Sequence, residues 1–471
     1  MRLSHVPVIL YNCDFHIRMR TMAAGFRSED MSEEARGSSK RSHPRHRYRA
    51  MAHDNAHASA AEQPPTSLPD HPLVPREPAT LITAPEDLAT LIEHIKTVGS
   101  FAYDSEFIGE MSYFPKLCLL QVATRQRVAL VDPLADLDLT SFWELVCDPN
   151  VEKIVHAGQQ DLEPVIRLLG KSPTNLFDTQ IAAGFMALSY PPALSKLARH
   201  LLGVHMGKGF TFTHWDQRPL TSVQLRYAAD DVRFLPAIRD IMGKRLEELG
   251  HARWVTEESE SLADRTRYEF DRETDYLKLR GVGSMAPQSL AIIRELMHWR
   301  DEGSREADLP PRSFLRDEVL IELARRPAKD VADLKRIRGL PKPVEDRHGQ
   351  AIVDATHKAM TQPQSQWPAV KSNDESPAEK FRVDALWASA QAWCMGRAID
   401  PSLVTGRQDM SNFYRLLSSG QSLDEHRLMR GWRREAVGDL LVDLVHGKRG
   451  MHVHWEAGAM QSFPVPPAHK T

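Results

Sequence analysis

Two acidic residues, Asp104 and Glu106, stand two positions apart at the end of a short apolar run that begins at Ser100. If this run is a β-strand, its two-residue side-chain period places both carboxylates on the same face. Like charges side by side repel each other, and a fold rarely keeps such a pair close without a compensating positive charge. The natural compensator is a divalent cation, but an Asp-x-Glu sequence also occurs in many solvated turns. The rest of the chain decides between these two interpretations.

Two later segments carry further acidic groups. Residues 153–165 predict a short buried strand, a glycine turn and a helix start that bears Asp161. Residues 225–235 predict a helix in which Tyr227 and Asp231 are four positions apart and therefore share a face. Three separate segments thus offer acidic groups in contexts that can converge.

These three segments resemble the exonuclease motifs of the DEDD superfamily in its tyrosine-bearing branch, and the surrounding sequence is similar to bacterial ribonuclease D. The similarity extends over roughly residues 79–460 and includes residues 113–123, 177–183 and 215–221, in the order that this family shows. Ser105 stands where threonine is commoner in the family. Because its side chain is expected to point to the opposite face of the strand from the two acids, this departure puts little in doubt.

Phosphodiester hydrolysis requires an activated water and stabilisation of developing charge, and two divalent ions about 4 Å apart supply both. Carboxylate oxygens favour Mg²⁺ or Mn²⁺ over metals that prefer softer ligands. By resemblance, Asp104 bridges both ions. Glu106 and Asp231 then complete the ion on the nucleophile side, and Asp161 helps to hold the other ion through water. The predicted cofactor is therefore a pair of divalent metal ions.

The hydroxyl of Tyr227 is expected to face the attacking water, one helical turn before Asp231. A free phenol has a pKa near 10, so orientation of that water is easier to defend than general-base catalysis. A packed core tyrosine is the alternative. Asp230 points about 100° away on the helix and is expected to be solvated or structural. Asp178 and Trp215 are expected to anchor helix packing.

Four further residues are candidates for substrate contact, and each has a structural alternative. The resemblance implies that Phe107 stacks on the 3′-terminal nucleotide and that Gln121 hydrogen-bonds to it, although a core role is equally open for both. His156 either contacts substrate or is a strand-end histidine that bonds to the backbone. Lys208, which lies between two glycines, either contacts a phosphate or is simply solvated.

The composition fits a soluble, globular protein. The chain has 471 residues, 42% hydrophobic and 26% charged, which predicts two to four domains. Its formal net charge of −3 gives no global sign of nucleic-acid binding, but a charged groove can be local. The four cysteines form no C-x-x-C pair, so neither a zinc site nor a disulfide framework is expected. No apolar run suits a membrane span or a signal-peptide core, and a cytoplasmic location is expected.

The first half of the chain predicts a tail followed by an α/β domain. Residues 1–78 lack hydrophobic periodicity and contain an arginine-rich stretch, so a disordered tail is expected, with a translation start at Met51 or weak RNA tethering as alternatives. A helix capped by Thr83 opens a domain over residues 79–249, for which a mixed sheet flanked by helices is predicted. The resemblance implies the ribonuclease H-like fold. Strands are expected at residues 101–105, 117–123, 128–132 and 153–156.

The second half predicts helical units without strands. Residues 250–283 are expected to be a helical linker, and residues 284–360 resemble the small helical domain called HRDC. A linker (361–378), a second HRDC-like domain (379–459) and a frayed tail (460–471) are expected to follow. Basic residues of the first HRDC-type domain are candidates for an RNA-facing surface, with plain solvation as the alternative. They are Arg294, Arg300, Arg312, Lys335, Arg336 and Arg338.

Together, these features predict a metal-dependent 3′-to-5′ exoribonuclease that releases nucleoside 5′-monophosphates. The resemblance implies that it acts on tRNA precursors and other small structured RNAs. The alternatives are a DNA-directed exonuclease, against which the two HRDC-type domains argue, and an inactive RNA-binding scaffold, against which the four acids and Tyr227 argue. A monomer is expected, with no obligatory protein partner and no association with membranes.

Overall fold

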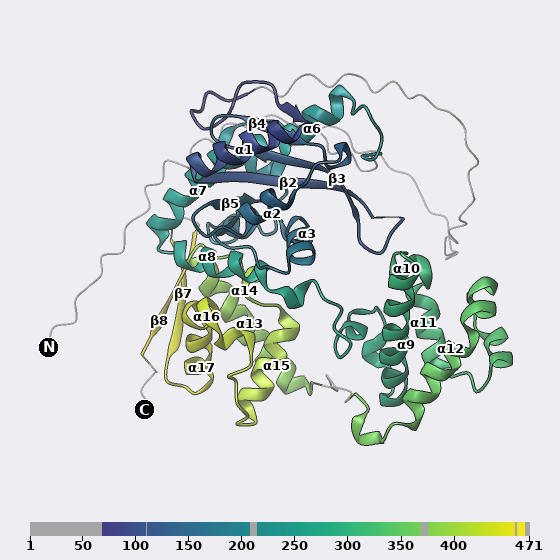
Figure 1. Cartoon of the computed structure of the whole chain (residues 1–471). Coiled ribbons are helices and arrows are strands. Elements are labelled where there is room, and N and C mark those ends of the chain that lie inside the picture. Colours follow the sequence, from purple (N-terminus) through teal and green to yellow (C-terminus); the bar gives the residue numbers. More distant parts are fainter. Residues whose placement is uncertain (1–67, 110, 208–213, 369–374, 457–458, 467–471) are drawn as a thin grey trace, which may run out of the picture. The chain divides into compact units, whose positions relative to one another are not determined.

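The computed structural model describes residues 68–466, apart from residue 110 and the short gaps at 208–213, 369–374 and 457–458 (Figure 1). Most of the predicted N-terminal tail and the predicted phosphate contact Lys208 therefore lie outside the described residues. Among the described helices, none is both long enough and apolar enough to cross a membrane.

A six-stranded mixed sheet forms the centre of the first folded domain. Its strands lie in the order β1-β4-β3-β2-β5-β6, and β3 runs antiparallel to β2 and β4 whereas the other pairs are parallel. The predicted mixed sheet is confirmed, and β1 and β6 are short strands that the sequence pattern did not predict. The strands are β1 (Thr80–Ile82), β2 (Ser100–Ile108), β3 (Lys116–Ala123), β4 (Val128–Val131), β5 (Glu152–Val155) and β6 (Leu176–Asp178).

Helices flank this sheet, and Figure 1 shows α6 and α3 on opposite sides of the strands. α6 packs across β2, β3 and β4, whereas α2 contacts α3 and places Phe142 against Tyr103 of β2. α1 begins at Pro85, whose missing N–H has no role at a helix start, and no side chain caps it. The predicted cap by Thr83 is therefore wrong. The helices are α1 (Pro85–Val98), α2 (Thr140–Val146), α3 (Gln159–Leu169), α4 (Thr179–Ala183), α5 (Leu194–Leu202), α6 (Ser222–Arg233), α7 (Leu235–Leu249) and α8 (Ala252–Glu260).

The next helical unit has a hydrophobic core of its own. Leu296 of α9 and Ile352 of α12 are fully buried in it, and α9 packs against both α11 and α12. Tyr276 and Val282, which precede the predicted domain boundary at residue 284, belong to the same core. The second half of the predicted linker therefore folds with this unit. Its helices are α9 (Pro287–Glu306), α10 (Pro311–Phe314), α11 (Asp317–Arg325) and α12 (Lys342–Thr361).

The last helical unit shares a buried cluster with the sheet domain, as the ring of Trp432 lies 4.7 Å from that of Phe185. It ends in an antiparallel hairpin that the sequence pattern did not predict. β8 packs on α13, where the Ser462 hydroxyl donates to the Ala392 carbonyl at 2.9 Å. The expectations of a purely helical unit and of a frayed end from residue 460 are therefore wrong. The elements are α13 (Pro377–Gly396), α14 (Pro401–Val404), α15 (Arg407–Ser418), α16 (Gly431–Arg433), α17 (Asp439–Val445), β7 (Gly450–Glu456) and β8 (Ala459–Val465).

Candidate active site

Strand β2 carries the first two acids of the candidate site. Asp104 lies opposite Gln121 and Glu106 lies opposite Leu119 on β3, so the two carboxylates share the face that α6 covers. On its other edge, β2 pairs with β5 only as far as Ala102. The pairing of these parallel strands thus ends before Asp104 is reached, which leaves the end of β2 open to the segment that follows β5.

That segment turns into α3 and brings Asp161 to β2. The turn is fixed by Asp178, whose carboxylate accepts hydrogen bonds from the backbone N–H groups of Ala157 and Gly158 and also caps α4. Asp161 lies in the first turn of α3 and is only 6% exposed. The expectation that Asp178 anchors helix packing therefore agrees with its contacts.

Ser105 has a larger role in this arrangement than its place between two acids suggested. Its hydroxyl donates to Oδ1 of Asp161 at 2.5 Å, and its backbone N–H donates to Oδ1 of Asp104 at 2.9 Å. The side chain does point to the face opposite Asp104, but α3 approaches β2 from that same face. The inference that serine in place of threonine puts little in doubt agrees with this contact, because both residues supply the hydroxyl that reaches Asp161.

Helix α6 supplies the remaining two residues from the other face. Thr221 caps α6 in a reciprocal capping box with Gln224, which fixes where the helix begins. Tyr227 and Asp231 then lie one turn apart, and the phenol hydroxyl donates a hydrogen bond to the Asp231 carboxylate. The ring of Tyr227 packs 6.3 Å from that of Trp215, in agreement with a packing role for the tryptophan. The shared face predicted from the helical period is present.

The acids of the site perturb one another strongly. Burial, and then repulsion from Asp104, raises the pKa of Glu106 to about 8. The pKa values of Asp161 and Asp231 are raised well above the ordinary range for aspartate, again by burial first and then by Asp104. Burial also raises the pKa of Asp104, which shares a hydrogen bond with Asp161. Asp104 is thus the common neighbour of the other three carboxyl groups.

The donor set of this site fits a hard divalent cation. All four side chains offer carboxylate oxygens. Among the described residues, no Lys, Arg or His side chain is one of the main causes of the shifts in their pKa values. The carboxamide of Gln121, opposite Asp104, is fully buried, and neither Oε1 nor Nε2 has a hydrogen-bond partner there. A buried amide without a partner costs about 1–3 kcal/mol, which suits a ligand or water that completes the site. In the metal-free arrangement of the described residues, no three His, Cys, Asp or Glu side chains are grouped closely enough to hold a metal ion, so the carboxylates would have to move together around one.

The structure gives different outcomes for the other predicted substrate contacts, which are His156, Gln121 and Phe107. His156 uses both ring nitrogens within the protein, on the Thr179 hydroxyl at 2.9 Å and the Pro192 carbonyl at 3.2 Å, and burial lowers its pKa. These bonds favour its structural alternative. Because Gln121 is fully buried, it can contact only a substrate group that enters the site. Phe107 is half-buried, and stacking of its ring on a base stays a prediction.

Replacing Tyr227 with phenylalanine is expected to lower the turnover number about 10²-fold and to lower Mn²⁺ affinity by a smaller factor, through the lost hydrogen bond to Asp231. Burial and the neighbouring acids raise the pKa of this phenol, so it keeps its proton at neutral pH, and we expect it to orient water rather than to abstract a proton. Single-turnover cleavage and calorimetric Mn²⁺ titration measure the two quantities. A loss of Mn²⁺ affinity as large as the loss of rate would contradict this role.

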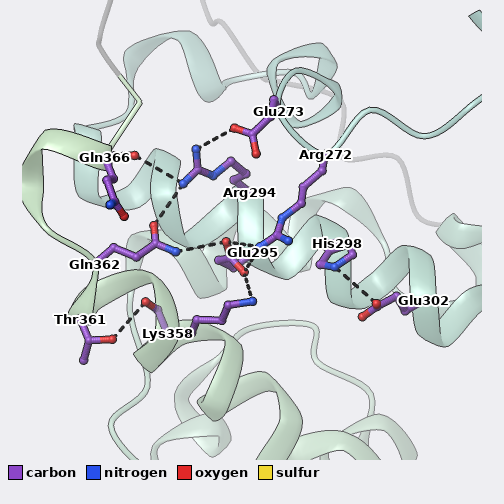
Figure 2. A network of polar contacts seen from close by, with 10 residues as sticks. All are labelled: Arg272, Glu273, Arg294, Glu295, His298, Glu302, Lys358, Thr361, Gln362 and Gln366. Atoms are coloured by element: carbon purple, nitrogen blue, oxygen red, sulfur yellow. Dashed lines mark hydrogen bonds and ion pairs between the residues drawn. The ribbon is translucent and has the colours of Figure 1, made fainter. Parts of the chain in front are cut away.

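Two of the basic residues proposed to face RNA lie inside the first helical unit. Figure 2 shows Arg294 bonded to Glu273, Gln362 and Gln366, and its side chain is only 13% exposed. Arg300 is 6% exposed and bonds to Asp317. Their prediction as RNA contacts is therefore wrong.

The same network explains how the preceding linker is held. The carboxylate of Glu295, 3% exposed, accepts two hydrogen bonds from Arg272 at 2.7 and 2.8 Å and pairs with Lys358 at 3.0 Å (Figure 2). A buried carboxylate is stable only when it is paired in this way. Arg272 thus attaches the linker to α9, and Lys358 attaches α12 to it. Charge alone does not distinguish such a structural role from nucleic-acid binding.

Two family models match the chain. One, described as 3′-5′ exonuclease, matches residues 79–247, and the other, described as HRDC domain, matches residues 289–356. The first match lies within the α/β domain predicted from the sequence, and the second lies within the first predicted helical domain.

Curated relatives and solved structures extend the similarity to most of the chain. Ribonuclease D of Gluconacetobacter diazotrophicus is 33% identical over 371 residues, which cover 78% of this chain and 93% of the relative. Ribonuclease D of Pseudomonas paraeruginosa is 33% identical over 77% of this chain and 98% of its own length. The crystal structure of Escherichia coli RNase D, described as an exoribonuclease involved in structured RNA processing, is similar with a TM-score of 0.69 and 26% identity, over 79% of this chain and 99% of that one.

Proposed function

Because this chain belongs to the ribonuclease D family, we propose that it is a divalent-metal-dependent exoribonuclease that removes nucleotides from RNA 3′ ends and releases nucleoside 5′-monophosphates. The observation that carries the proposal is the set of four mutually perturbed carboxyl groups around Asp104, with the Tyr227 hydroxyl beside them. Mutual repulsion of buried acids is expected where a protein is built to hold cations. We infer that tRNA precursors and other small structured RNAs are the substrates.

In this proposal, each residue has a defined task. Two divalent ions, when bound, activate a water and stabilise the charge that develops on phosphorus. Asp104, Glu106 and Asp231 would hold the ion on the nucleophile side. Asp104 and Asp161 would hold the other. Tyr227 orients the attacking water through its hydroxyl.

Two contacts would fix the 3′ end of the strand in this site. The ring of Phe107, next to the register shift in the β2–β3 pairing, would stack on the terminal base. The carboxamide of Gln121 would hydrogen-bond to a group of the terminal nucleotide that enters the site, which would satisfy its buried atoms.

The proposal is tested by product analysis on matched substrates. The full chain is incubated with a 3′-extended tRNA transcript and with single-stranded DNA of the same 3′ sequence, in Mg²⁺, in Mn²⁺ and in excess EDTA. Nucleoside 5′-monophosphates separated by chromatography are expected from the RNA only, and only with metal. Preferential release from DNA would favour the DNA-directed alternative, and binding of RNA without any release would favour the scaffold.

Two exposed cations of the first helical unit are the better candidates for RNA contacts. Lys335 and Arg338 are exposed, and neither has an ion pair recorded within the described residues, whereas Arg336 pairs with Asp333 and Arg312 with Asp317. Phosphate contacts of this kind add to affinity in a way that salt weakens.

The double replacement of Lys335 and Arg338 by alanine is expected to weaken RNA binding several-fold. The slope of the logarithm of the binding constant against the logarithm of salt concentration is expected to become shallower by roughly one to two units, since each lost phosphate contact removes about one. Affinity measured by fluorescence anisotropy over a salt series tests this. Lys244→Ala, which removes an exposed lysine of α7 that pairs with Asp240, is the matched control and is expected to leave the slope unchanged. An unchanged slope in the double variant would exclude these residues as contacts.

A further inference from the structure

We propose that Ser105 is a positioning residue that sets the Asp161 carboxylate for metal binding. This inference rests on the proposed metal-dependent function, and it goes beyond the four acids and the tyrosine that the family motifs name. Its basis is the hydrogen bond from the Ser105 hydroxyl to Oδ1 of Asp161, at 2.5 Å. The two residues are 56 positions apart in sequence and come from different elements, β2 and α3.

A single residue here connects two carboxyl groups. The backbone N–H of Ser105 donates to Asp104 while its hydroxyl donates to Asp161, and the two aspartates share a hydrogen bond with each other. The three residues therefore form a closed set of contacts at the end of β2. Any rotation of the Asp161 side chain breaks its bond with the Ser105 hydroxyl.

The location of the contact gives it a consequence for metal binding. Asp161 is 6% exposed, and a carboxylate side chain without a donor on either oxygen is free to turn about its torsion. A hydroxyl that donates to one oxygen restricts the torsion of the Asp161 side chain, so the carboxylate keeps its position beside Asp104. Partners of this kind, one step outside the ligands, typically change metal affinity by about 10- to 100-fold when they are removed.

A neighbouring hydroxyl provides an internal comparison. Tyr103 lies two residues earlier on the same face of β2, is 1% exposed, and has a hydroxyl without a hydrogen-bond partner among the described residues. Its phenol is close enough to Asp161 to be perturbed by it. Removal of this hydroxyl changes the burial environment of Asp161 without removing a bond to it.

The decisive experiment compares shape-matched variants of the full chain. Ser105→Thr keeps the hydroxyl, whereas Ser105→Val has the same branched shape without it, and both residues suit a strand. Binding of Mn²⁺ to the protein without RNA is measured by electron paramagnetic resonance and by calorimetry, and folding is checked by thermal unfolding in EDTA. We expect Mn²⁺ affinity to fall about tenfold in Ser105→Val, and to stay within about twofold of wild type in Ser105→Thr and Tyr103→Phe.

A double-mutant cycle identifies the group through which Ser105 acts. In the Asp161→Asn background, Ser105→Val is expected to cause no further loss of Mn²⁺ affinity, because the carboxylate that it positions is gone. In cleavage assays, the single variant is expected to require more metal for half-maximal rate while its rate at saturating metal stays near that of wild type. A merely structural hydroxyl would instead lower the unfolding temperature and leave Mn²⁺ affinity unchanged.

The results separate this inference from the proposed function. Wild-type Mn²⁺ affinity in Ser105→Val, or a full additional loss in the Asp161→Asn background, would overturn the positioning role even if the protein degrades RNA. Absence of RNA degradation by the wild type, combined with weaker Mn²⁺ binding in Ser105→Val and not in Ser105→Thr, would sink the proposed function and leave the positioning role standing.

Discussion

Asp104→Asn is expected to lower the rate of RNA degradation by about 10³-fold or more, with little effect on folding. Charge stabilisation by bound metal contributes several kcal/mol to such reactions, and each 1.36 kcal/mol is a factor of about ten in rate. Asp104 is the residue at which this loss is expected to be largest, because it is the one that perturbs Glu106, Asp161 and Asp231 alike. Asparagine keeps the shape and can still accept the Ser105 N–H bond, but it removes the charge.

The matched control for this variant is another acid of the same region. Glu163 lies two residues after Asp161 on α3 but pairs with Arg167 at 2.7 Å, away from the other acids. Glu163→Gln is therefore expected to keep the rate within a few-fold of wild type. Initial rates of 5′-monophosphate release at saturating Mn²⁺ compare the two variants. Wild-type activity in Asp104→Asn would remove the basis for the assigned site.

The four inner strands, β2 to β5, were predictable because each has at least four residues and contains consecutive apolar residues. β1 and β6 have three residues each and carry too little periodicity to be recognised. The hairpin was missed for another reason. The alternating residues of β7 are a strand signal, but they follow a long helical region, and only packing on α13 shows that they fold.

The site was predictable as far as its residues lie within one element. The period of a strand gave the shared face of Asp104 and Glu106, and the period of a helix gave that of Tyr227 and Asp231. Ser105 was beyond such reasoning, because alternation gives the face to which a side chain points but not which helix lies there.

The basic residues of α9 show the same limit. Arg294 and Arg300 carry the charge that RNA contacts require, yet their partners are Glu273, Gln362 and Asp317, which approach only in the folded domain. Whether a basic side chain faces solvent or pairs with an acid inside the protein depends on its neighbours in the folded structure, which the local sequence does not show.

Glu106→Gln is expected to abolish activity and, at the same time, to stabilise the metal-free protein at alkaline pH. In the folded protein the pKa of Glu106 is raised from 4.5 to about 8 by burial and by Asp104. Between these two values the folded state holds a proton that the unfolded state has lost, so the stability of the wild type falls as pH rises. The destabilisation is absent below about pH 4.5 and fully present above about pH 8.

Glutamine carries no charge at any of these pH values and escapes this loss. In EDTA, the unfolding temperature of Glu106→Gln is therefore expected to exceed that of wild type by roughly 2–6 °C at pH 8.5 and to match it near pH 4.5. This range follows because a change of about 1 kcal/mol in the free energy of unfolding shifts the unfolding temperature by a few degrees. Scanning calorimetry at the two pH values measures the difference, with Glu163→Gln as the control. An equal advantage at both pH values would mean that improved packing, and not removal of the charge, is the cause.

Addition of Mn²⁺ is expected to reverse the order of the two proteins. A bound cation stabilises only the folded state, and it does so more strongly when all four carboxylates are present. Wild type is then expected to unfold at a higher temperature than Glu106→Gln at pH 8.5. The repulsion that weakens the metal-free protein is the same interaction that a cation relieves, so an unchanged order in Mn²⁺ would show that Glu106 does not bind the metal.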